Sequence, residues 1–197
     1  MAIARPSIQI INVKSMDGNK PAQILGIVPG RRVVGFAVLN ETGLKNFGVK
    51  SLRRFESDNQ RLLAINRFLC SVMSSINPRA VVVLKPSPQK ATSFNLQLIS
   101  FIRGLASSRY CPLYFLSIKQ VKGVLGENRK LANQREIAEV LRASYPELEY
   151  YTPDSESKVI NGREKYYQPL FAAIGLAFSY LKLSQNDKQP EDNSTKP

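Results

Sequence analysis

The order of strand-like and helix-like patterns constrains this chain more than any other feature of its sequence. Ala80–Leu84 is an unbroken apolar run, which is typical of a strand buried on both faces. Shorter strand patterns precede it, separated by turn signals at Pro29 and Gly30 and again from Asn40 to Gly43. Helical patterns then alternate with strand patterns. This order predicts an α/β fold, with a mixed sheet of five or slightly more strands and helices on both faces.

Periodicity predicts the individual segments. From Asp58 to Ile76 apolar residues recur at helical spacing, with Asp58 as the expected N-cap. The other expected strands are Ile8–Val13, Ile24–Ile27, Val33–Leu39, Leu44–Leu52 and Leu113–Leu116, and the other expected helices are Ser93–Leu105, Asn133–Ser144 and Pro169–Leu183. We expect residues 1–183 to form one domain, in which 1–20 add an N-terminal strand and turn. Residues 184–197 are polar, and we expect a disordered tail.

Charge bears on the partner. The 28 Lys and Arg residues exceed the 15 Asp and Glu residues, giving a net charge of +13, which favours a polyanion such as nucleic acid. The chain contains no histidine, which excludes catalytic triads and metal sites that use one. Cys70 and Cys111 lack metal-ligand spacing, and we expect both to be reduced.

Two further signals bear on location. The longest apolar stretch, Leu170–Leu181, is shorter than the ~20 residues that a membrane span requires. The segment Met1–Pro6 lacks the features of a secretory signal. We therefore expect a cytoplasmic protein without a membrane partner.

Three segments, in order, resemble the RuvC family of Holliday-junction resolvases. Ile24–Gly30, followed by Val33–Val38, resembles that family's strand ending in Gly-Ile-Asp-Pro-Gly and the strand after it. Ala80–Lys85 stands where the family's fourth strand ends in a glutamate. Ser117–Gly126, continued by Arg129–Arg135, is similar to the family's Val-Lys segment and the helix start after it, and Ala172–Ala177 is a weaker match to the last helix. The resemblance implies a ribonuclease-H-like fold.

The resemblance also implies two-metal hydrolysis of a phosphodiester, in which carboxylates hold two Mg²⁺ ions. At the corresponding positions this chain has Val28, Lys85 and Ala172, and Pro169–Leu183 contains no acid at all. We therefore expect no catalytic residues, no bound metal and no cofactor. A displaced set of acids is the alternative, drawn from Asp17, Glu41, Glu56, Asp154 and Glu156.

Lys85 suggests what replaced the chemistry: a metal-free, basic cleft that binds phosphate. The alternative is a lysine that extends into solvent. The expected nucleic-acid-binding residues are Arg31, Arg32, Lys85, Lys119, Lys122, Arg129, Lys130 and Arg135. For the run from Lys119 to Arg135 the alternative is a solvated helix face, and Arg53 with Arg54 is interpreted as an ordinary charged strand end. Stacking on bases is an open alternative to core packing for Phe94, Tyr166 and Tyr167.

These patterns favour a non-catalytic protein that binds branched or structured nucleic acid, with DNA favoured over RNA. Two alternatives remain: an active structure-specific endonuclease with displaced acids, and a protein-interaction scaffold. The apolar helices could also carry a homodimer interface or bind other subunits, as the resemblance implies.

Overall fold

The structure is a computed structural model, and it describes residues 21–87, 89, 91–127, 129–151 and 162–186. The expected strand Ile8–Val13 and residues 187–197 of the expected tail lie outside these ranges. The elements are β1 (Ile24–Val28), β2 (Val33–Asn40), β3 (Gly43–Ser51), α1 (Asp58–Ile76), β4 (Ala80–Leu84), α2 (Ser93–Ser107), β5 (Leu113–Leu116), α3 (Ile118–Gly126), α4 (Gln134–Ser144), the 3₁₀ helix η2 (Pro146–Tyr151) and α5 (Gly162–Asn186).

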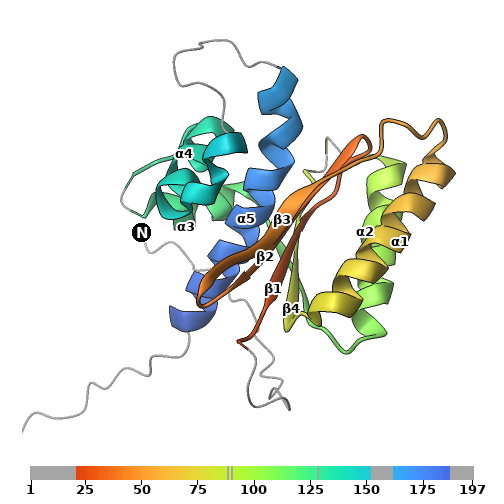
Figure 1. Ribbon diagram of the computed structural model, residues 1–197, viewed down its shortest axis with the longest axis horizontal. Coiled ribbons are helices and arrows are strands. Elements are labelled where there is room, and N and C mark those ends of the chain that lie inside the picture. The colour runs from red at the N-terminus through yellow and green to blue at the C-terminus, as the bar shows by residue number, and fades with distance from the viewer. Residues whose placement is uncertain (1–20, 88, 90, 128, 152–161, 187–197) are drawn as a thin grey trace, which may run out of the picture.

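The strands form one mixed sheet in the order β3-β2-β1-β4-β5. Strands β1, β2 and β3 make an antiparallel meander, while β4 pairs parallel with both β1 and β5. Helices α1 and α2 cover one face of this sheet, and α3, α4 and α5 cover the other (Figure 1). The mixed α/β sheet expected from the sequence is therefore confirmed.

The two faces of the sheet pack differently. Leu25 and Ile27 alternate with Ile24 and Val28 along β1, so each pair enters a different core. On the α1 and α2 side, large side chains fill the space, including Ile65, Leu69, Met73, Phe94, Leu98 and Ile102, each with an exposed fraction of 2% or less. At roughly 1.5–3 kcal/mol for each fully buried side chain, such contacts dominate the stability of that layer.

On the other face, the backbone of α5 lies almost directly on the sheet. A Cβ atom added at Gly26 would lie 2.2 Å from the carbonyl oxygen of Ala173, and one at Gly35 would lie 2.1 Å from that of Pro169. Neither distance is possible between real atoms, so glycine is required at both positions. The small residues of α5 allow this approach, and Leu170–Ala177 is buried throughout.

Several sequence expectations need correction. Helix α5 begins at Gly162, not at Pro169, and it includes residues 184–186 of the expected tail. Helix α1 starts where expected, but Ser57, rather than Asp58, is its N-cap. Helix α3 and the η2 turn were not expected as separate elements.

Cys70 and Cys111 are both free thiols, and no described helix is long and apolar enough to cross a membrane.

Candidate nucleic-acid interface

One end of the sheet collects the segments that the sequence singles out. Strands β1, β4 and β5 are parallel, so their C-terminal ends lie at the same end of the sheet. Strand β2 is antiparallel to β1 and begins at this end, where Val28 pairs with Gly35. Lys85 follows β4, and its backbone N–H extends the ladder by donating to the carbonyl of Leu116 over 2.8 Å. We call this end of the sheet, where β1, β4 and β5 terminate and β2 begins, the basic end.

At three positions where the resemblance implies carboxylates, this chain has Val28, Lys85 and Ala172, and these residues lie in two different environments. Val28 and Ala172 are 8% and 3% exposed and belong to the same apolar cluster, beneath the first turns of α5 that pack on Gly35. Both positions are therefore enclosed by apolar groups on the side of the sheet that α5 covers. Lys85 is exposed, with its backbone fixed by the strand ladder.

Four arginines surround the same end. Arg31 and Arg32 lie in the connection from β1 to β2, and the carbonyl of Arg32 accepts the N–H of Leu52 over 2.8 Å. That bond holds the end of β3 beside the start of β2, and so places Arg53 next to Arg32. Arg61 comes from the first turn of α1, whose start is fixed by a capping box between Ser57 and Gln60. The side chains of Arg32, Arg53 and Arg61 line one hollow of about 430 Å³.

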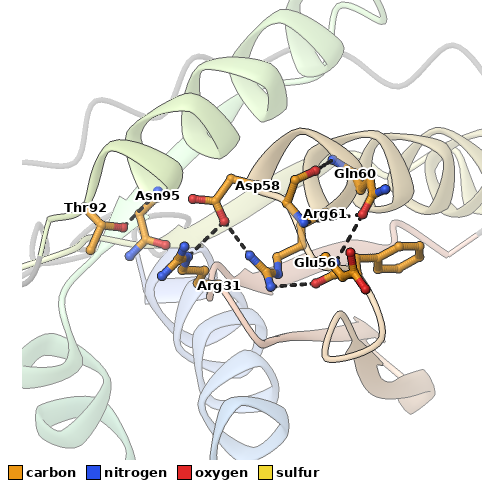
Figure 2. Close-up of polar contacts among 9 residues, drawn as sticks. Arg31, Glu56, Asp58, Gln60, Arg61, Thr92 and Asn95 are labelled. Atoms are coloured by element: carbon orange, nitrogen blue, oxygen red, sulfur yellow. Dashed lines mark hydrogen bonds and ion pairs between the residues drawn. The ribbon is translucent and has the colours of Figure 1, made fainter.

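Asp58 holds two of these arginines in place (Figure 2). Its Oδ1 atom accepts from Nε of Arg31 over 2.9 Å and from Nη1 of Arg61 over 2.7 Å. Hydrogen bonds from Arg31 and then Arg61 lower the pKa of the Asp58 carboxyl, and the bond to Asp58 raises the pKa of Arg31. Asp58 is therefore ionised at neutral pH and neutralises part of the arginine charge.

Arg61 is held more firmly than the other arginines. Its Nη2 donates to the carbonyl of Phe55, and its side chain is only 15% exposed. Its Nε is buried and, within the described part of the chain, has no hydrogen-bond partner. Arg53 instead lies over the ring of Tyr166, 5.4 Å from the centroid, so the first turns of α5 also support the hollow.

The other predicted basic residues are spread more widely. Lys119 is exposed in the first turn of α3, directly after β5, and so lies at the basic end. Lys122 donates to the carbonyl of Ala132, and Arg135 is half-buried at the start of α4. Arg129 and Lys130 are exposed just beyond Glu127, which pairs with Lys182 over 3.1 Å. Lys182 is some 20 Å along α5 from Pro169, so this second group lies away from the basic end.

The aromatic residues considered for base stacking and the acids considered as displaced metal ligands do not gather at one place in the structure. Phe94 is 2% exposed and packs in the core, while Tyr167 packs against Tyr151 at 5.1 Å between ring centroids. Glu41 lies in the turn from β2 to β3, one strand length from Glu56 near the start of α1, so these two acids do not meet. Asp17, Asp154 and Glu156 are outside the described ranges. Among the described residues, no three Cys, Asp or Glu side chains gather as a metal site would require.

The sequence alone does not place Arg53 or Arg61 at the basic end. From its pattern Arg53 is interpreted as an ordinary charged strand end, and no prediction is made for Arg61. The pairing of Leu52 with Arg32 brings Arg53 beside Arg32, and the bond from Arg61 to the carbonyl of Phe55 ties the start of α1 to the segment that follows β3. The one available signal is the turn from Asn40 to Gly43, because a tight turn makes the strands on its two sides pair, and such pairing sets Arg53 near Arg32.

The sheet order and its covering helices define the class: the chain has the ribonuclease-H-like fold. Among solved structures, it is similar to RuvC of Thermus thermophilus, both in complex with a Holliday-junction substrate and without it. The TM-scores are 0.64 and 0.62, at 18% sequence identity, over 84% of this chain and 96% of RuvC. It is also similar to the fowlpox virus resolvase in complex with Holliday-junction DNA, with a TM-score of 0.52 and 12% identity over 81% of this chain and 99% of the other.

At these identities the likeness establishes the fold and not the activity. Neither a protein-family model nor a curated protein sequence matches the chain.

Proposed function

We propose that this protein binds branched DNA through the basic end of its sheet, without a metal ion, and does not cut it. The convergence of Arg32, Arg53 and Arg61 on one hollow, at the end of the sheet where β1 and β4 also end, carries the proposal. Guanidinium groups bind phosphate oxygens in a planar, two-bond geometry, and they need no metal to do so. The similarity to two resolvases whose structures hold Holliday junctions favours a branched substrate over plain duplex.

The absence of cleavage rests on chemistry at the same end. Two-metal hydrolysis requires carboxylate oxygens close together, because Mg²⁺ prefers hard oxygen ligands. Val28 and Ala172 offer only apolar groups there, and Lys85 would repel a divalent cation. Asp58 lies beside Arg61 at this end, and its Oδ1 atom already accepts hydrogen bonds from two arginines.

Lys85 tests the proposal with a matched control. In a band-shift assay in EDTA and low salt, we expect the wild type to bind a four-way junction more tightly than duplex, single-stranded DNA or RNA. Lys85→Glu reverses a charge at the basic end, and we expect it to weaken junction binding at least tenfold. Lys45→Glu makes the same change on exposed β3 near the opposite end, and should have little effect. Unchanged junction affinity in Lys85→Glu would contradict binding at this end.

The same assay tests the alternatives. Cleavage of the junction on addition of Mg²⁺ or Mn²⁺ would overturn the non-cutting part and favour an active nuclease with displaced acids. Failure to shift any nucleic acid at low salt would overturn the DNA-binding part and favour a scaffold for an acidic protein partner.

A further inference from the structure

The hollow lined by Arg32, Arg53 and Arg61 has features that a general basic surface lacks. Binding along a DNA backbone is commonly spread over many separate cations, each near one phosphate. Here three arginines from three different segments, the β1–β2 connection, the end of β3 and the start of α1, line a single hollow of about 430 Å³. Such a concentration of like charge is unfavourable, and Asp58 offsets only the part carried by Arg61.

Each of the three arginines is positioned by a different contact. Arg61 is held by Asp58 and by the carbonyl of Phe55. Arg53 is held against the ring of Tyr166. The backbone of Arg32 is fixed by its bond to Leu52, while its side chain is exposed. Because two of the three guanidinium groups are already oriented, little side-chain entropy is lost when a ligand binds.

The hydrogen-bonding capacity of the arginines is not used up by the protein. Within the described residues, neither Arg32 nor Arg53 forms an ion pair with a carboxylate. Arg61 already donates to Asp58 and to the carbonyl of Phe55, and its Nε is enclosed by protein atoms, so the available donors are those of Arg32 and Arg53. Asp58 lies at the rim, but its oxygen is shared between Arg31 and Arg61. Several donors therefore remain for an anion that carries several oxygens.

We propose that this hollow is a socket for a single phosphate group of the bound nucleic acid. This rests on the proposed function and names the group that the basic end recognises. A phosphodiester has two non-bridging oxygens and a terminal phosphate has three, and they are arranged tetrahedrally around phosphorus. They can therefore accept from guanidinium groups on different sides, whereas the two oxygens of a carboxylate lie in one plane. The phosphate has two possible sources, an internal phosphodiester where strands exchange or the 5′-terminal phosphate of a strand.

Inorganic phosphate tests the socket without DNA. We would follow the Nε–Hε signals of arginine by ¹⁵N NMR while phosphate is added at constant ionic strength. We expect saturable shifts of a small set of signals, and the set should include those lost in Arg32→Gln and Arg53→Gln. Acetate at the same ionic strength should produce no saturable shift. Shifts that never saturate, or that persist unchanged in Arg53→Gln, would overturn the socket; saturation by acetate would do so as well and would favour an acidic protein partner.

DNA then separates the two sources. A nicked junction carrying a 5′-phosphate is compared with the same junction carrying a 5′-hydroxyl, for the wild type, Arg53→Gln and the matched control Arg79→Gln, which is exposed at the start of β4 at the opposite end. We expect Arg53→Gln to weaken binding about tenfold and Arg79→Gln to change it less than twofold. A loss seen with both junctions identifies an internal phosphate, and a loss confined to the 5′-phosphate identifies a terminal one.

The two proposals fail in different ways. Unchanged junction affinity in Arg53→Gln, together with weakened binding in Lys85→Glu, would overturn the socket and retain DNA binding at the basic end. Saturable phosphate binding by a wild type that binds no DNA would overturn the proposed function. Thermal unfolding of Arg53→Gln checks that the variant is folded, since its contact with Tyr166 is partly exposed.

Discussion

Two regions lie side by side at the basic end, and they differ in almost every physical property. Val28 and Ala172 are buried, apolar and covered by α5. Arg32, Arg53 and Arg61, in contrast, line an open hollow at the same end of the sheet. Metal-dependent hydrolysis needs carboxylates and water in the first region. Phosphate binding needs only the cations of the second. The difference teaches that one end of a sheet can join an open cationic region to a buried apolar one, and the proposed function assigns DNA binding to the cationic region alone.

Replacing Ala172 by an acid is the most severe test of whether the region around Val28 and Ala172 excludes water. We expect Ala172→Asp to lower the free energy of unfolding by about 3–5 kcal/mol, because a carboxylate there is buried without a charged partner. Urea denaturation measures the loss. Ala91→Asp, at an exposed position before α2, is the control and should change stability by less than about 0.5 kcal/mol. Equal small losses in both variants would mean that the Ala172 site is open to water.

Gly35 tests how closely α5 seals that region. A methyl group there would meet the carbonyl of Pro169, so we expect Gly35→Ala to cost about 1–3 kcal/mol of unfolding free energy. The control is Gly104→Ala in α2, where an added Cβ has no neighbour within 4 Å. That variant should be neutral, or more stable by up to ~1 kcal/mol. A harmless Gly35→Ala substitution, measured in the same denaturation assay, would mean that the helix lies further from the sheet.

Within the arginine hollow, Arg61 and Arg53 are expected to differ in how much they contribute to the stability of the fold. Arg61→Gln removes a partner from Asp58 and from the carbonyl of Phe55, and we expect a loss of about 1–2 kcal/mol in stability. Arg53→Gln removes only a half-exposed ring contact, so its stability should change by less than about 1 kcal/mol. Thermal unfolding of both variants checks this. Equal destabilisation by the two substitutions would contradict the distinct roles of these arginines.

The sequence predicts the fold better than the site, for identifiable reasons. Ala80–Leu84 and the helix from Asp58 carry their own periodicity, so local pattern is enough to place them. The start of α5 was misplaced because proline usually marks the first turn of a helix, whereas Pro169 lies inside α5.

The arginine hollow is a tertiary feature. Arg61 follows a helical pattern that indicates only a polar face, and nothing local links it to Arg32 or Arg53. Lys85 is predicted from the resemblance, and Arg31 and Arg32 from the turn that follows the first matched strand; the structure places all three at one end of the sheet. Lys119, Arg129 and Lys130 are predicted together, from their clustering in the third matched segment, but Arg129 and Lys130 lie away from that end.

The most direct test of metal-free binding at the basic end is the salt dependence of junction affinity in EDTA. Dissociation constants of a four-way junction would be measured from 50 to 200 mM NaCl, for the wild type, Arg32→Gln and Arg79→Gln. We expect tight binding without metal, a slope of log affinity against log salt that falls by about 1 in Arg32→Gln, and an unchanged slope in Arg79→Gln. Binding that requires Mg²⁺, or equal slopes in all three proteins, would contradict the account.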